Sequence, residues 1–251
     1  MSSAAKPIFV TAKTPAGVAR AAAELLAMRA RQAVAARGVF TLALSGGTTP
    51  HMLFRLLSTP KWTQRVPWEK TIVFWVDERC VPTSHMESNY GAARRTLTPL
   101  AGALAVLPMD GDAVPEYAAR HYETLLREKL LSIPDNTLHR NATAIPRIDM
   151  ILLGIGEDGH TASIFPGESA CNESEALVLA QYPSGKTSRI TLTFPMLNAA
   201  RCCAFLVTGD AKRKIVHMAR DSKHSSLFPA QDICPYDGEL YWITDAKIRD
   251  S

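Results

Sequence analysis

Arg147-Ile-Asp-Met-Ile-Leu-Leu-Gly-Ile-Gly-Glu-Asp-Gly-His-Thr-Ala-Ser-Ile-Phe-Pro166 is the stretch on which the fold of this chain depends. Its apolar run, Met150 to Leu153, has the length and composition of a buried central strand in a parallel sheet. Glycines, which tolerate backbone angles that other residues resist, then bracket Glu157 and Asp158, and His160 follows. Because ligands of open α/β sheets bind at the carboxyl ends of the strands, the stretch predicts a strand that delivers a titratable loop to a site.

Strands alternate with helices along the rest of the chain. Strands are expected at 7–12, 39–44, 71–76, 150–153, 176–180, 189–194, 202–208 and 241–244, and helices at 15–38, 52–57, 89–97, 116–131 and 211–219. Residues 62–68 are expected to form a loop or short turn, and residues 132–147 a loop. The alternation predicts a single domain, 1–251, built as an α/β three-layer sandwich with a mainly parallel, Rossmann-like sheet and helices on both faces.

The composition is that of an ordinary globular protein, with 47% hydrophobic and 21% charged residues and a net charge of +4. The basic residues form no block, so nucleic acid is not an expected partner, and no apolar stretch is long enough to span a membrane. The five cysteines include the neighbours Cys202 and Cys203, which we interpret as packed, reduced thiols of an intracellular protein. No spacing predicts a metal site. The arginine-rich segment Ala16 to Arg37 is interpreted as a structural helix and not as a removed targeting segment, because a strand-like run precedes it.

The segment Gly154-Ile-Gly-Glu-Asp-Gly159 matches the glycine pattern of dinucleotide-binding loops, but its context does not fit. In that fold the glycines open a long helix, whereas Pro166 follows within about two turns. The acid that binds the ribose should close the next strand, yet Glu173 and Glu175 precede the strand expected at 176–180. We therefore expect no nicotinamide cofactor.

His160 is a candidate general base. Glu157 and Asp158 are close enough in sequence for one carboxylate to accept a hydrogen bond from an imidazole nitrogen, which leaves the other nitrogen free to take a proton. The alternative is that one of the two acids caps a helix beginning near Thr161.

The segment Ser45-Gly-Gly-Thr-Thr-Pro50 is typical of an anion-binding turn between a strand and a helix. Gly46 and Gly47 allow backbone N–H groups to approach a phosphate, Thr48 supplies a hydroxyl, and the helix dipole favours negative charge. The segment is not a Walker loop, because no lysine stands in register, and Ala43 excludes a nucleophile elbow. A plain tight turn is the alternative.

Charged residues mark the ends of two other strands. Asp77 and Arg79 follow the strand at 71–76, and Lys186 and Arg189 flank the start of the strand at 189–194. Each alone could form only a surface salt bridge. Their convergence on one histidine and one glycine loop favours a phosphate-bearing substrate, which an arginine can bind with two parallel hydrogen bonds.

Five motifs resemble, in order, those of the 6-phosphogluconolactonase family. They are Ser-Gly-Gly-Thr-Thr-Pro at 45–50, Asp-Glu-Arg at 77–79, Ser-Asn at 88–89, Gly-Ile-Gly-Glu-Asp-Gly-His-Thr-Ala-Ser-Ile-Phe-Pro at 154–166 and Arg-Ile-Thr-Leu-Thr at 189–193. The resemblance implies hydrolysis of 6-phosphogluconolactone to 6-phosphogluconate in the oxidative pentose phosphate pathway, without a metal or organic cofactor. The expected partner is the small sugar-phosphate lactone, and we expect a monomer or weak homo-oligomer in the cytoplasm.

The resemblance also implies roles for individual residues. His160 would be the general base that activates water, and Asp158 would orient it. Substrate and its phosphate would be held by Gly46, Gly47, Thr48, Asp77, Arg79, Lys186 and Arg189. Lys212 is an alternative to Lys186.

Two other functions stay open at this point. Glucosamine-6-phosphate deaminase resembles the family in fold and in its Ser-Gly-Gly loop, but it carries Asn-Gly-His where this chain has Asp158-Gly159-His160. A non-catalytic sugar-phosphate sensor would keep the anion-binding loop and lose the base. The pairing of Asp158 with His160 favours the lactonase over both.

Overall fold

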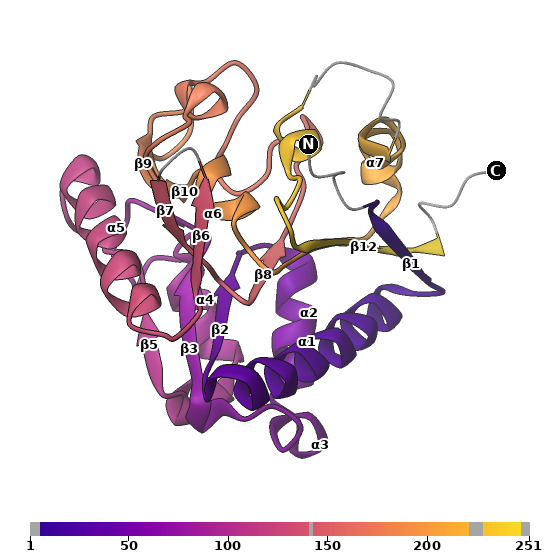
Figure 1. Cartoon of the computed structure of the whole chain (residues 1–251). Coiled ribbons are helices and arrows are strands. Elements are labelled where there is room, and N and C mark those ends of the chain that lie inside the picture. Colours follow the sequence, from indigo (N-terminus) through magenta and orange to yellow (C-terminus); the bar gives the residue numbers. More distant parts are fainter. Residues whose placement is uncertain (1–5, 141–142, 221–227, 247–251) are drawn as a thin grey trace.

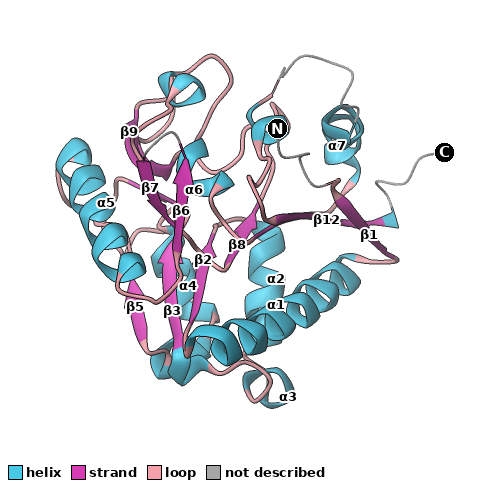
Figure 2. Cartoon of the chain, in the orientation of Figure 1, coloured by secondary structure: helices cyan, strands magenta, loops and turns pink. Residues whose placement is uncertain are grey.

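The centre of the molecule is a seven-stranded sheet in which every neighbouring pair of strands is parallel (Figures 1 and 2). The computed structural model describes residues 6–140, 143–220 and 228–246. In sheet order the strands are β1 (Ile8–Ala12), β12 (Glu239–Asp245), β11 (Cys202–Val207), β8 (Met150–Leu153), β2 (Phe40–Leu44), β3 (Thr71–Trp75) and β5 (Ala105–Leu107). The predicted mainly parallel α/β sandwich is confirmed.

The strand predicted at Met150 to Leu153 lies in the middle of this sheet, between β11 and β2. All four of its residues are buried, as are all residues of β2 and β11. Such strands need apolar side chains on both faces, which is why they appear in the sequence as continuous hydrophobic runs. Cys202 and Cys203 point to opposite faces of β11, and both are buried free thiols, as predicted.

Helices cover both faces of the sheet (Figure 1). They are α1 (Pro15–Arg37), α2 (Thr48–Leu57), α3 (Pro60–Thr63), α4 (Asn89–Thr96), α5 (Pro115–Leu131), α6 (Phe194–Asn198) and α7 (Arg213–Arg220). The first helix has the ends that its sequence predicts: Thr14 Oγ1 accepts from Gly17 N at 3.1 Å, and Gly38 ends the helix with φ 77°. Helices α1 and α2 pack together on one face, and α5 lies on the other.

Two small antiparallel sheets depart from the predicted pattern. One joins β4 (Asp77–Arg79), β10 (Arg189–Leu192) and β9 (Val178–Gln181), so Asp77 to Arg79 form a strand of their own beyond the end of β3. The other pairs β6 (Thr137–Arg140) with β7 (Thr143–Pro146), so the loop predicted at 132–147 is wrong at 137–140 and 143–146 and correct at 132–136 and 147. Both of these strands have four residues, and β6 has no buried face, so no apolar alternation marks it.

Other short elements also escaped prediction. Residues 62–68, expected as a loop or turn, contain the end of the four-residue helix α3, and β5 and α6 were not predicted. No helix begins near Thr161; instead Thr161 and Ile164 form a bridge across a tight turn. The absence of a long helix after Gly159 agrees with the rejection of a dinucleotide loop.

Strand order reverses between β8 and β2. From β2 the chain proceeds outward through β3 to β5, and from β8 it proceeds the other way through β11 and β12. Crossover connections leave this reversal point on opposite sides, which opens a crevice at the carboxyl ends of the two strands. The loops after Leu44 and Leu153 are the two that the sequence singled out.

Candidate active site

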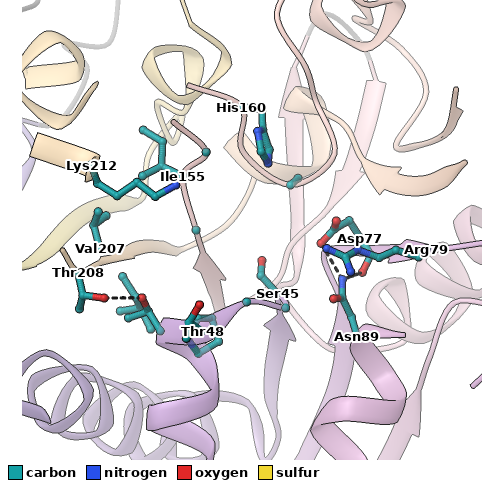
Figure 3. Close-up of a pocket in the computed structure, with 18 residues that line it drawn as sticks. Ser45, Thr48, Asp77, Arg79, Asn89, Ile155, His160, Val207, Thr208 and Lys212 are labelled. Atoms are coloured by element: carbon teal, nitrogen blue, oxygen red, sulfur yellow. Dashed lines mark hydrogen bonds between the residues drawn. The ribbon is translucent and has the colours of Figure 1, made fainter. Parts of the chain in front are cut away.

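A pocket lies at the carboxyl ends of β2, β3, β8 and β11 (Figure 3). Its lining comprises residues 45–50, Asp77, Arg79, Asn89, residues 154–156, His160, Ala162, residues 206–208 and Lys212. The pocket volume is about 240 Å³. It suits a small molecule.

The loop after β2 forms the floor of the pocket and begins α2. Ser45 Oγ donates to Leu152 O at 2.8 Å, which ties the loop to the central strand. Gly47, with φ 105°, is the N-cap of α2 and has no side chain with which to cap it. The first N–H groups of the helix therefore face the pocket without a side-chain acceptor, as an anion-binding turn requires.

Asn89 fixes the position of this loop relative to β4. Its Nδ2 donates to Asp77 O at 2.9 Å and to Asp77 Oδ1 at 3.3 Å. A Cβ on Gly46 would lie 1.8 Å from Asn89 Oδ1, so only glycine fits at position 46. Asp77 Oδ2 in turn accepts from Ser163 Oγ at 2.7 Å. Asp77 lines the pocket as predicted, but its carboxylate already joins three segments of the chain.

His160 faces the pocket from the loop after β8, opposite the Ser45 to Thr48 turn (Figure 3). Its Nδ1 lies 2.5 Å from Asp158 Oδ1, and its backbone N donates to the same oxygen at 3.2 Å. A carboxylate can only accept, so Nδ1 is the donor of this hydrogen bond, and in the neutral imidazole Nε2 is then the free acceptor. Of the two acids that the sequence left open, Asp158 is the partner.

The loop geometry around His160 depends on glycine. A Cβ on Gly156 would lie 2.0 Å from His160 Nδ1, and Gly156 N donates to His160 O at 2.8 Å, which closes the loop. Burial raises the pKa of Asp158, but the hydrogen bonds from the His160 ring and backbone outweigh burial, so the pKa of this carboxyl lies below its usual value. Asp158 is therefore a carboxylate at neutral pH.

Arg79 and Arg189 face each other across the small antiparallel sheet. They are register partners on β4 and β10, where like charges destabilise a pair. Burial, and then the charge of Arg79, lower the pKa of Arg189. Both Nε atoms are buried without a partner among the described residues, and Arg79 NH1 donates only to Glu87 O, at 2.7 Å. Two cations so arranged favour a bound anion.

The two candidate lysines occupy different places. Lys212 lines the pocket on the wall opposite Arg79 (Figure 3). Lys186, expected at the phosphate, is not among the lining residues; its Nζ lies 4.0 Å from Asp158 Oδ2. Arg189 is also outside the lining and is only 9% exposed, and its position on β10 pairs in register with Arg79 on β4. The alternative Lys212 thus lines the pocket where Lys186 does not, because it ends the short 3-10 helix Asp210–Lys212 that follows β11.

Several lining residues were not among the sequence-predicted candidates. Thr208, at the end of β11, shares a hydrogen bond of 2.9 Å with Thr49. Ala162 has a left-handed backbone with φ 53°, a conformation that costs energy for a residue with a Cβ. The position of Thr208 directly after a buried strand could have been a signal, since the other lining loops share it. The strain at Ala162 has no counterpart in the sequence.

Among the described residues, neither a metal-ligand cluster nor a membrane-spanning helix is found. No group of three or more His, Cys, Asp or Glu side chains is placed there to hold a metal ion. Within the same part of the chain, no helix combines the length and apolarity needed to cross a membrane.

Known proteins are similar to this chain over most of its length. Residues 13–242 match the model of a family described as glucosamine-6-phosphate isomerases/6-phosphogluconolactonase. A probable 6-phosphogluconolactonase 3, chloroplastic, of Oryza sativa subsp. indica is 37% identical over 241 residues, covering 91% of this chain and 71% of the relative. A 6-phosphogluconolactonase of Nostoc sp. is 35% identical, covering 89% of each chain. The solved structure of 6-phosphogluconolactonase from Trypanosoma brucei superposes with a TM-score of 0.84 at 27% identity, covering 97% of each chain.

Proposed function

The chain belongs to the glucosamine-6-phosphate isomerase/6-phosphogluconolactonase family, and from this premise we propose that it hydrolyses 6-phosphoglucono-1,5-lactone to 6-phosphogluconate with His160 as general base. The single observation that carries the proposal is the His160–Asp158 pair, held at 2.5 Å on the side of a small pocket opposite an anion-binding turn. A neutral imidazole at that position can take a proton from water.

In the proposed reaction, His160 Nε2 first accepts a proton and then returns it. His160 Nε2 removes a proton from a water molecule as the water oxygen attacks the lactone carbonyl carbon, and the negative charge moves to the carbonyl oxygen. When the intermediate collapses, the bond to the ring oxygen breaks and that oxygen receives the proton from His160. Asp158 stabilises the imidazolium that exists between these two steps. A lactone is an activated ester, so no covalent nucleophile is required.

Two cationic walls can bind the charges of the substrate and product. We assign the phosphate to the turn Gly46, Gly47 and Thr48 together with Lys212, because helix N–H groups and an ammonium meet there. Arg79, supported by Arg189, faces the pocket from the opposite wall. It is suited to the oxyanion of the intermediate and to the carboxylate of the product.

The proposal is tested by generating the lactone in situ with glucose-6-phosphate dehydrogenase and following acid release. We expect lactonase activity from the wild-type chain, and a kcat at least about a hundredfold lower in His160→Ala with KM little changed. Near-full activity of His160→Ala would remove the assigned role. Release of ammonia from glucosamine 6-phosphate, followed in parallel, would favour the deaminase instead.

We propose a single domain over residues 1–251 that acts in the cytoplasm as a monomer or weak homo-oligomer. The rice relative carries the word chloroplastic in its name, so imaging of the full chain fused to a fluorescent protein tests the location. Light scattering over a range of concentrations tests the assembly.

A further inference from the structure

The turn between β9 and β10 presents Lys186 and is anchored on both sides. Before the turn, Tyr182 Oη donates to Glu116 Oε1 on α5. After it, Thr187 Oγ1 donates to Glu87 Oε2 at 3.1 Å, and Ser188 O accepts from Cys80 N at 2.8 Å. These contacts reach three different segments, so the backbone that carries Lys186 has a defined place.

The ammonium of Lys186 contacts two residues that both touch His160. Its Nζ lies 4.0 Å from Asp158 Oδ2 and 4.4 Å from the centroid of the Phe165 ring. Asp158 uses its other oxygen, Oδ1, for His160, and Phe165 packs on the imidazole with ring centroids 4.6 Å apart. Lys186 is thus at the far end of a chain of contacts that runs through Asp158 to the proposed base.

We propose that Lys186 is a positioning residue of the proposed lactonase reaction, acting on His160 through Asp158, and that it is not a phosphate ligand. The inference rests on the proposed function, because it assigns a role relative to His160 as base. The ammonium holds Oδ2 so that Oδ1 stays directed at the ring, and its positive charge opposes the formation of imidazolium. Both effects keep the base neutral and aligned.

The charges around His160 support this division of roles. Asp158 comes from the same loop, and Lys186 comes from the β9–β10 turn. Across the pocket stand Asp77, Arg79 and Lys212, of which Asp77 is held by its own hydrogen bonds. Lys186 is the one cation with a contact to Asp158 among the described salt bridges, and its charge contributes to lowering the pKa of that carboxyl.

The test compares the pH dependence of kcat/KM in the wild type, Lys186→Met and Lys186→Arg. Methionine keeps an unbranched stem against Phe165 but removes the charge, and arginine keeps the charge. In Lys186→Met we expect the acid limb to move to higher pH by about 0.3–0.5 unit, since imidazolium loses a repulsive neighbour. The pair is 45% exposed on each side, so about 0.5 M salt should reduce the shift. Lys186→Arg should keep the wild-type profile.

Lys212→Met is the matched lysine control. We expect it to raise KM for the phosphorylated lactone and to leave the acid limb in place, because Lys212 lines the pocket and has no contact with Asp158 among the described salt bridges. If Lys186→Met instead raises KM and leaves the acid limb unmoved, Lys186 binds the phosphate and the proposal is overturned.

A second measurement does not require catalysis. Carbon-13 NMR follows the titration of the Asp158 carboxyl, identified by the signal that Asp158→Asn lacks. We expect the pKa of Asp158 to rise in Lys186→Met and not in Lys186→Arg, because the lysine charge favours the carboxylate. An unchanged titration would overturn the proposal even if the wild type is an active lactonase. An inactive wild type with a shifted titration would instead overturn the proposed function and keep the Lys186–Asp158 contact.

Discussion

Replacing Asp158 by asparagine tests the centre of the proposed site, because it changes one atom and one charge. The carboxylate accepts from His160 Nδ1 at 2.5 Å and keeps the imidazole in the tautomer with a free Nε2. An amide oxygen can still accept this hydrogen bond, but without the charge. If the amide turns its NH₂ group toward the ring, the proton moves to Nε2 and the base is blocked.

The expected loss follows from the geometry. A hydrogen bond to a charged group contributes about 1.5–3 kcal/mol, against about 0.5–1.5 kcal/mol for a neutral one. The Asp158 side chain is 45% exposed, so solvent weakens the charged hydrogen bond. We therefore take about 1.4 kcal/mol as the difference between the charged and the neutral hydrogen bond, which corresponds to about tenfold in rate. Enzyme molecules in which Nε2 carries the proton are inactive and add to the loss of rate. We therefore expect kcat/KM of Asp158→Asn to fall between about tenfold and a hundredfold.

The charge lost in Asp158→Asn also sets the direction in which the pH profile of kcat/KM should move. An amide stabilises imidazolium less than a carboxylate does, so the acid limb of the kcat/KM profile should move to lower pH in Asp158→Asn, opposite to the direction expected for Lys186→Met. Glu157→Gln is the matched control, since Glu157 is an exposed neighbour and should leave rate and profile unchanged. The coupled dehydrogenase assay between about pH 5 and 8 measures both. An Asp158→Asn enzyme with wild-type kcat/KM and an unmoved acid limb would refute the reasoning.

Two further substitutions separate the site from the scaffold. Gly156→Ala places a carbon 2.0 Å from His160 Nδ1, so the imidazole ring must move. We expect kcat to fall about a hundredfold in the lactonase assay, while the urea midpoint of unfolding stays near that of the wild type. An active variant would show that the loop can relax. Tyr122→Phe removes a buried hydroxyl that accepts from Trp75 N at 2.8 Å and donates to Leu107 O at 3.0 Å. We expect urea unfolding to show a loss of about 1–3 kcal/mol with kcat unaltered, and equal stability of the two proteins would contradict this.

The sequence alone determined six of the seven strands of the central sheet, all but β5, and the loops after β2 and β8. Buried parallel strands need apolar residues on both faces, so the runs at Met150 to Leu153 and at 202–208 were recognisable without a structure. Thr14 and Gly38 marked the ends of the first helix through local backbone chemistry. His160 and the 45–50 turn were identifiable because glycines, a titratable cluster and an abrupt strand end coincide within a few residues.

Only the tertiary structure decided which side chains share the pocket. Asn89, Thr208 and Lys212 come from segments distant in sequence, and the strand reversal between β8 and β2 that brings them to one pocket is visible only in the fold. Lys186 shows the same limit: the family resemblance implied a phosphate ligand, and only the structure shows that its Nζ lies 4.0 Å from Asp158 Oδ2 and outside the pocket lining. Local propensity identifies strands and turns because it acts over a few residues. A site is made by long-range packing instead. The direction in which a side chain points depends on every element packed against it.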